Sequence, residues 1–224
     1  MRSVESNLAV IRDKITQSCK KVGRDPRDIK IIAVTKYSTI ERTKEAMEAG
    51  ITHLGENRDQ EFLNKYEALG NEPTWHFIGT LQSRKVKNII DKVDYIHSLD
   101  RLSLAKEINK RANKSINCFV QVNVSGEESK HGLSPEDTIP FIESLQQYSN
   151  IRVIGLMTMA PHTKDEMILR SCFKKLRQLQ KDIQLLSLNN APCRELSMGM
   201  SNDYEIAIEE GATYIRIGTA LVGE

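Results

Sequence analysis

The sequence contains no apolar run that could span a bilayer. Its longest uninterrupted apolar runs extend over only a few residues, whereas a transmembrane helix needs about 20. Residues 1–6 also lack the apolar core of a secretory signal. We therefore expect a protein that neither inserts into a membrane nor is exported across one.

A large charge of either sign is absent as well. The chain has 32 basic and 30 acidic residues, which leaves a net charge of +2. Without a large basic field there is little to hold a polyanion, so no nucleic-acid partner is expected. The basic segment 83–87 is the only support for a nucleic-acid or structural module, and a solvated helix face accounts for it better.

Paired cysteines and helical metal-ligand pairs are missing. The cysteines lie far apart without a C-x-x-C pair, which favours reduced thiols, predicts a cytoplasmic protein and argues against a disulfide frame or zinc site. The histidines are scattered, without the i, i+4 spacing of a helical metal pair. The residues concerned are Cys19, Cys118, Cys172, Cys193, His53, His76, His97, His131 and His162.

What the sequence has instead is an alternation of strand and helix patterns. Short apolar runs predict strands at 31–35, 53–55, 75–78, 95–98, 117–124, 152–157, 195–197 and 214–217. Helix patterns cover 4–21, 40–49, 60–69, 83–91, 100–112, 134–147, 165–185 and 204–209. About eight such units close a parallel barrel. We predict an α/β fold, a single (β/α)8 barrel domain over residues 1–224 with an extra N-terminal helix and no helix after the last strand.

A doubly wound open sheet is the competing fold. It would place a glycine fingerprint directly after the first strand. The segment there is Thr35-Lys36-Tyr37-Ser38, which contains no glycine, and no Walker phosphate loop occurs. The closed barrel is therefore the better prediction.

Lys36 lies at the predicted carboxyl end of the first strand, the end at which barrels place their active sites. Partial desolvation of an amine there favours its neutral, nucleophilic form. Neutral lysine amines form Schiff bases with aldehydes. The alternative is a lysine that extends to the surface as its strand ends.

The loops after strands seven and eight offer a place for an anion. Barrels often bind phosphate with these two loops. Ser201 contributes a hydroxyl at the start of a helix, and Gly218 with Thr219 allows close approach of backbone amides. Helix capping and a simple turn are the alternative. Because strand eight neighbours strand one in a closed barrel, an amine beside such a cradle suits a phosphorylated aldehyde, of which pyridoxal phosphate is the commonest cofactor.

Several stretches, in order along the chain, resemble the pyridoxal phosphate homeostasis protein family, which is similar to the N-terminal barrel of alanine racemase. They are Ala33-Val34-Thr35-Lys36, Gly55-Glu56-Asn57, His76-Phe77-Ile78-Gly79 with Leu81-Gln82, Gly155-Leu156-Met157, Leu196-Ser197-Met198-Gly199-Met200-Ser201-Asn202-Asp203 and Arg216-Ile217-Gly218-Thr219. The resemblance runs from about Leu8 to Gly223. One departure is that the family usually has Lys-Thr-Lys-Pro, or a near relative, where this chain has Lys36-Tyr37-Ser38-Thr39.

The resemblance implies a cofactor site. Lys36 would carry pyridoxal 5'-phosphate as an internal aldimine. Arg216 would face the pyridine nitrogen, where a guanidinium opposes protonation and weakens the ring as an electron sink. The alternative is that Arg216 pairs with an acid at the barrel end. The implied positions are Ser201, the amide of Met200, Gly218 and Thr219 at the phosphate, Arg216 at the pyridine nitrogen, and Asn57 beside the ring and its phosphate.

The implied function is a carrier and buffer in intracellular pyridoxal phosphate homeostasis, not an enzyme, with pyridoxal phosphate-dependent apoenzymes as recipients. Alanine racemase adds a β-domain, and a partner subunit supplies a tyrosine as second base. This chain ends directly after strand eight, so we expect no two-base racemisation and a monomer. Two alternatives stay open: a single-base racemase or related amino-acid enzyme that uses pyridoxal phosphate, and a Schiff-base aldolase without a cofactor.

Overall fold

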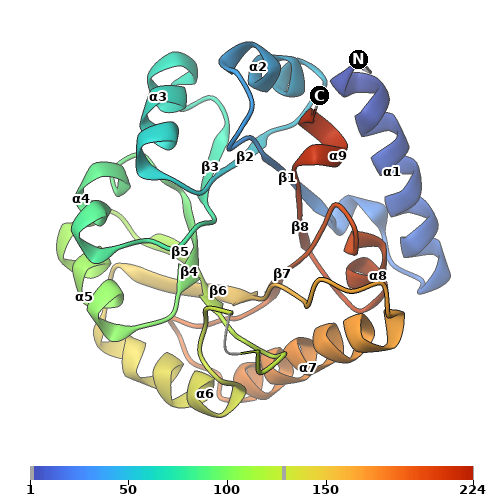
Figure 1. The fold of residues 1–224 in the computed structure, drawn as a ribbon. Coiled ribbons are helices and arrows are strands. Elements are labelled where there is room, and N and C mark those ends of the chain that lie inside the picture. Colours follow the sequence, from blue (N-terminus) through green and yellow to red (C-terminus); the bar gives the residue numbers. More distant parts are fainter. Residues whose placement is uncertain (1–2, 128–129, 224) are drawn as a thin grey trace.

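A computed structural model describes residues 3–127 and 130–223, and the strands of this part of the chain close into one parallel barrel (Figure 1). Each strand is hydrogen-bonded to the next in sequence, and β1 pairs with β8. The predicted barrel is therefore confirmed. The strands are β1 (Lys30–Val34), β2 (His53–Glu56), β3 (Thr74–Phe77), β4 (Tyr95–Leu99), β5 (Ile116–Gln121), β6 (Ile151–Met157), β7 (Glu195–Met200) and β8 (Tyr214–Ile217).

The helices form a ring outside the barrel (Figure 1). They are α1 (Val4–Lys21), α2 (Ile40–Glu48), α3 (Asp59–Leu69), α4 (Val86–Ile89), α5 (Leu102–Arg111), α6 (Pro135–Ser144), α7 (Glu166–Leu185), α8 (Tyr204–Glu209) and α9 (Thr219–Val222), with 3-10 turns η1 (Pro26–Asp28), η2 (Ser83–Lys85) and η3 (Leu145–Gln147). Across the described residues, none of the helices combines the length and the apolar character that crossing a bilayer requires.

The first helix shows how local sequence sets an element. Ser3 Oγ accepts a hydrogen bond from the Ser6 amide at 3.1 Å and so caps the start of α1. Apolar residues spaced three or four apart, among them Leu8 and Ile11, form its buried face. This face covers the side of the barrel next to α8 and α9, and both chain ends lie in that region (Figure 1).

Four predicted elements differ from the structure. The strand predicted at 117–124 ends at Gln121, because the Asn123 amide bonds to the Leu133 carbonyl and the chain leaves the barrel. The segment 83–91 forms only η2 and one turn of α4, since the amides of residues 92 and 93 both close onto the Ile89 carbonyl. β7 extends to Met200, and a helix, α9, follows β8.

The barrel interior differs in character from the layer between strands and helices. The layer outside the strands is a large apolar core, to which α1 contributes Val4 and Leu8. Inside the barrel, a small apolar cluster of Ile32, Phe119 and Tyr214 shares the space with buried polar side chains. Buried polar groups need hydrogen-bond partners. The arrangement of side chains inside the barrel therefore depends on hydrogen bonds as well as on apolar packing.

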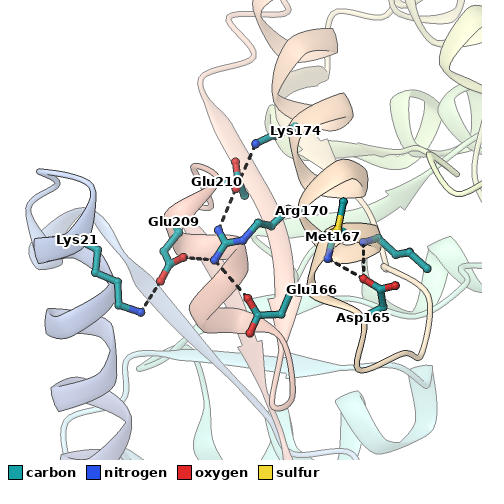
Figure 2. Close-up of polar contacts among 9 residues, drawn as sticks. Lys21, Asp165, Glu166, Met167, Arg170, Lys174, Glu209 and Glu210 are labelled. Carbon is teal, nitrogen blue, oxygen red and sulfur yellow. Dashed lines mark hydrogen bonds and ion pairs between the residues drawn. The ribbon is translucent and has the colours of Figure 1, made fainter.

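A network of ion pairs ties α7 and α8 together and reaches α1 (Figure 2). Arg170 of α7 contacts Glu209 at 2.5 Å and Glu210 at 3.0 Å, and both carboxylates are largely buried. Lys21 of α1 reaches Glu209 at 2.8 Å, whereas Lys174 lies 4.0 Å from Glu210. We call this group the Arg170 cluster; it consists of Lys21, Glu166, Arg170, Lys174, Glu209 and Glu210.

Candidate functional site at the carboxyl ends of the strands

Lys36 lies in the turn after β1, two residues beyond the last strand residue, Val34. Its side chain is half-buried, and its amine lies 5.0 Å from the centre of the Tyr37 ring. Tyr37 is itself 80% exposed. The position at the carboxyl end of the first strand is as predicted, while the amine lies at the rim of the barrel mouth with part of its surface in solvent.

A buried ion pair holds the backbone just before Lys36. Lys65 Nζ donates to Glu56 Oε1 at 2.7 Å and to the Thr35 carbonyl, and the Thr35 hydroxyl donates to the same Glu56 oxygen at 2.5 Å. Burial raises the pKa of the Glu56 carboxyl, and the bonds from Lys65 and Thr35 act against this rise. Because the Thr35 carbonyl belongs to the peptide bond of Lys36, these contacts fix where the lysine leaves the strand.

Asn57 follows β2 and has a buried side-chain oxygen. Its Oδ1 has no hydrogen-bond partner among the described residues. The loop after β3 approaches closely: a Cβ on Gly79 would lie 2.3 Å from the Asn57 carbonyl oxygen, so glycine is needed for this contact. An unpartnered buried polar group costs about 1–3 kcal/mol, so the side-chain oxygen of Asn57 is a candidate acceptor at this end of the barrel.

β7 brings Met200 and Ser201 to the barrel mouth. The Met200 amide donates to Asp203 Oδ1 at 2.6 Å, so this predicted anion donor has a partner in the structure. Burial raises the pKa of the Asp203 carboxyl, and the Met200 amide acts against that rise. Asp203 is the N-cap residue of α8, but its side chain makes no capping bond to the helix and restrains the preceding turn instead.

Gly218 and Thr219 begin α9 at the end of β8. The Gly218 carbonyl accepts the amides of Leu221 and Val222 at 2.9 and 3.0 Å. The amides of Thr219 and Ala220 precede these first helical bonds, and amides in that position have no partner within the helix. The structure thus presents backbone donors where the sequence predicts an anion cradle.

Lys36, Gly218 and Thr219 line one cavity of about 290 Å³. Arg42 of α2 also lines it, and its guanidinium bonds to Glu45 Oε2 at 2.6 Å. This meeting of residues far apart in sequence follows from the parallel pairing of β1 with β8. The prediction that barrel closure brings the lysine beside the loop after strand eight is confirmed.

The other predicted donors border different spaces. Met200 and Ser201 line a larger groove of about 920 Å³ together with the loop after β6. Ser201 also lines a small cavity of about 150 Å³, which it shares with Ala220. The structure therefore divides the predicted phosphate donors among three spaces instead of gathering them in one.

Arg216 of β8 is buried inside the barrel, with 4% of its surface exposed. It donates to Ser197 Oγ at 2.7 Å and to the Thr158 carbonyl at 2.9 Å, two neutral acceptors. Burial lowers the pKa of Arg216 to about 10, and the nearby Asp203 acts against this. The guanidinium stays charged at neutral pH, and no described hydrogen bond or ion pair joins it to an acid.

Sequence reasoning missed a line of polar residues inside the barrel. His53, His76 and His97 bond to one another in turn, at 2.9 Å each, and His97 bonds to Ser197 at 2.9 Å. Burial lowers the pKa of His76 and of His97 well below the ordinary value. The signal that could have found them is that three successive strands, β2, β3 and β4, each carry one of these histidines.

Fold and mouth define a class of protein: a (β/α)8 barrel with a lysine after its first strand and backbone donors after its last. The family described as alanine racemase, N-terminal domain, matches residues 6–224. The pyridoxal phosphate homeostasis protein of Aquifex aeolicus (strain VF5) is 44% identical over 221 residues, which cover 97% of this chain and 96% of that relative.

Solved structures are similar to this chain over nearly its whole length. An unknown protein from Bifidobacterium adolescentis superposes with a TM-score of 0.93 at 34% identity, over 98% of this chain and 94% of that one. PipY of Synechococcus elongatus PCC7942, with PLP bound, gives 0.86 at 32% identity, over 98% of this chain and 100% of that one. The chain belongs to the pyridoxal phosphate homeostasis protein family.

Proposed function

We propose that this protein holds pyridoxal 5'-phosphate at the barrel mouth, with Lys36 as the covalent attachment point, and serves intracellular pyridoxal phosphate homeostasis as a carrier and buffer. The observation that carries the proposal is the shared cavity of Lys36, Gly218 and Thr219. Family membership and the PLP-bound relative PipY support it. The cofactor supplies an aldehyde, which combines reversibly with a primary amine, and a phosphate, which needs several donors.

The residues present fit such a group. The Asn57 oxygen is buried without a partner, as expected of a group that waits for a ligand. Gly218 carries no side chain that would cover the first amides of α9, so an anion can approach the backbone there. Lys36 supplies the only reaction the proposal needs, because its amine lies at the rim of the same cavity.

The phosphate contacts we propose are Ser201, the Met200 amide, Gly218 and Thr219. The Met200 amide now bonds to Asp203, so a phosphate would take the place of that carboxylate.

Arg216 would face the pyridine nitrogen. Its bonds to Ser197 and Thr158 use one N–H of each terminal nitrogen, and a guanidinium has five N–H donors in all. A charged donor opposite that nitrogen keeps protons away from it, which suits storage better than carbanion chemistry. We propose on this ground that the protein does not turn over amino acids. We also propose that it acts as a monomer in the cytoplasm and passes its cofactor to apoenzymes.

The test is a visible spectrum with borohydride trapping. Wild type with added pyridoxal phosphate is expected to show a band at about 420 nm and, after reduction, a modified Lys36 by peptide mass spectrometry. Lys36→Ala and Lys36→Arg should lose both signals. Lys164→Ala is the matched control, because this exposed lysine lines the neighbouring groove and should leave both unchanged. An undiminished adduct in Lys36→Ala would contradict the proposal.

Turnover separates the carrier from the single-base enzyme. The loaded protein is incubated with L-alanine in deuterated water, and the α-proton is followed by NMR. We expect no exchange above that of free pyridoxal phosphate. Racemisation at an enzymatic rate would refute the carrier role, and retention of the yellow band would still distinguish that outcome from a cofactor-free aldolase.

A further inference from the structure

Three imidazoles and a hydroxyl form one continuous hydrogen-bonded chain inside the barrel. His53 Nδ1 lies 2.9 Å from His76 Nε2, His76 Nδ1 lies 2.9 Å from His97 Nε2, and His97 Nδ1 lies 2.9 Å from Ser197 Oγ. Arg216 Nη1 then bonds to Ser197 Oγ at 2.7 Å. We call His53, His76, His97 and Ser197 the histidine column. It crosses the barrel from the start of β2 to the arginine near its mouth.

Aromatic rings hold the two inner imidazoles in place. His76 stacks on Tyr95 with ring centres 4.4 Å apart, and His97 stacks on Phe119 at 4.3 Å. Tyr214 lies edge-on to His97 and Phe119. Since both imidazoles are fully buried, they cannot exchange these partners for water without opening the barrel.

The arginine favours one direction for the bonds in the histidine column. A guanidinium has donors only, so Ser197 Oγ accepts from Arg216. One set of tautomers leaves no hydroxyl proton unpaired among the described hydrogen bonds: Ser197 donates its proton to His97 Nδ1, and His97 carries its own proton on Nε2. That proton is donated to His76 Nδ1, and His76 in turn donates from Nε2 to His53 Nδ1.

Burial first, and the surrounding charges second, keep the inner imidazoles neutral. Lys30 and Arg216 face the column from β1 and β8 and lower the histidine pKa values, and Asp94 acts in the opposite direction on His53 only. The column is not a metal site: its ring nitrogens face one another, and no metal-binding group of three or more His, Cys, Asp or Glu occurs in the described part of the chain. Nor can the column deliver protons to the mouth, because the protonated Arg216 at its end cannot accept one.

What remains is orientation. We propose that the histidine column is a positioning device for Arg216, in which Ser197 and His97 hold the guanidinium plane toward the barrel mouth. This rests on the proposed function in one respect, that Arg216 faces the ring nitrogen of pyridoxal phosphate. The column matters because no acid in the described part of the chain bonds to this guanidinium; an accepting hydroxyl, whose own proton is donated to an imidazole, orients it instead.

The open end of the column is His53. It is half-buried and lines a cavity of about 380 Å³ on the amino-terminal side of the barrel, beside Lys30 and Arg12. His53 is the first residue of β2, so this cavity lies on the side away from Lys36. The column therefore reaches solvent only on the face that does not hold the cofactor.

The first test needs no cofactor. Nitrogen-15 NMR of histidine-labelled protein at neutral pH should show His53, His76 and His97 neutral, each protonated on Nε2. In Ser197→Ala, His97 loses its donor partner, and its Nδ1 resonance should move toward that of an unbonded nitrogen. A proton on Nδ1 of His76 or His97 in wild type, or a charged inner imidazole, would overturn the proposed direction.

The second test uses the bound chromophore. Ser197→Ala removes one of the hydrogen bonds that hold Arg216. The visible band of the bound cofactor changes with pH, and we expect the midpoint of this change to shift by about 0.5–1 pH unit, which corresponds to the free energy of one hydrogen bond. Ser197→Thr restores the hydroxyl and should return the midpoint toward wild type. The matched control is Ser98→Ala, since Ser98 Oγ is also buried but has no hydrogen-bond partner; it should leave the midpoint unchanged.

The outcomes separate the two proposals. Equal midpoints in wild type and Ser197→Ala, with an intact adduct on Lys36, would overturn the positioning role and leave the carrier function standing. A shift as large in Ser98→Ala would also overturn it, because packing would then be the cause. A wild type that forms no adduct would refute the carrier function, and the NMR measurement would still decide the column.

Discussion

Two arginines of this protein have opposite surroundings. Arg170 lies on the outer layer between α7 and α8, where two buried carboxylates, Glu209 and Glu210, neutralise it (Figure 2). Arg216 lies inside the barrel and is held by a hydroxyl and a backbone carbonyl. Hydrogen bonds to the glutamates raise the pKa of Arg170, whereas burial lowers that of Arg216 to about 10.

The difference shows what each arginine can do. The charge of Arg170 is cancelled by its partners, so its contribution is to hold helices together. Among residues 3–127 and 130–223, no acid bonds to Arg216. A buried charge without such a partner is costly unless a ligand uses it. We interpret the Arg170 cluster as structural. Arg216 has only neutral hydrogen-bond acceptors among the described residues, and we interpret this as typical of an arginine that binds a ligand.

The largest expected contrast between the two regions is in how their contributions to the free energy of unfolding change as the pH falls. His76 and His97 have folded pKa values well below the unfolded value of about 6.5. The unfolded state therefore binds more protons below pH 6.5, and stability falls as the pH drops, by up to about 1.4 kcal/mol per pH unit for each histidine. Glu209 has a lowered pKa, so the Arg170 cluster keeps its contribution until the pH falls below the ordinary glutamate range.

Urea unfolding at pH 7, 6 and 5 measures this contrast. Glu56 and Asp203, whose pKa values are raised, act with the opposite sign, so the slope is compared between wild type and His97→Asn. The variant should lose up to about 1.4 kcal/mol per pH unit of the wild-type slope. Identical slopes would show that His97 is charged, or exposed, in the folded protein.

Arg216→Met should separate binding from folding. Loss of a charged hydrogen bond to the cofactor is expected to weaken pyridoxal phosphate binding by about 10- to 100-fold. The stability of the cofactor-free protein should change little, because the variant also removes a buried charge without a bonded acid. Fluorescence titration and urea unfolding measure the two effects; a large loss of stability with unchanged affinity would reverse the comparison.

Arg170→Met should show the mirror image. It leaves Glu209 and Glu210 without their main partner, for which we expect a loss of about 1–2 kcal/mol in the free energy of unfolding. This is below the value for a fully buried pair, because Arg170 is 31% exposed and solvent screens its charge. Cofactor affinity, measured by the same titration, should not change; if it does, the cluster is coupled to the mouth.

The smallest effect is expected at the rim of the Arg170 cluster. Lys174 is 66% exposed and lies 4.0 Å from Glu210, so Lys174→Met should change the free energy of unfolding by less than about 0.5 kcal/mol. Thermal unfolding at low and high salt serves as the measurement. A loss equal to that of Arg170→Met would mean that Glu210 depends on both cations equally.

Much of the site could be predicted because it depends on chain order. Lys36 follows the first strand and Gly218 the last, and closure of a parallel barrel brings such positions together. The Asp203 contact to the Met200 amide could not be predicted, because it depends on how far β7 extends.

The sequence by itself determined the elements and their order. Spacing of apolar residues and the Ser3 cap define α1 within a few neighbouring positions, and the alternation of strand and helix defines the barrel. Only the tertiary structure decided which polar groups meet inside it. His53, His76, His97 and Ser197 come from four strands, up to 144 positions apart, and the direction of their bonds depends on one arginine. Periodicity reports the face that a residue occupies, whereas hydrogen-bond partners follow from closure of the barrel and burial.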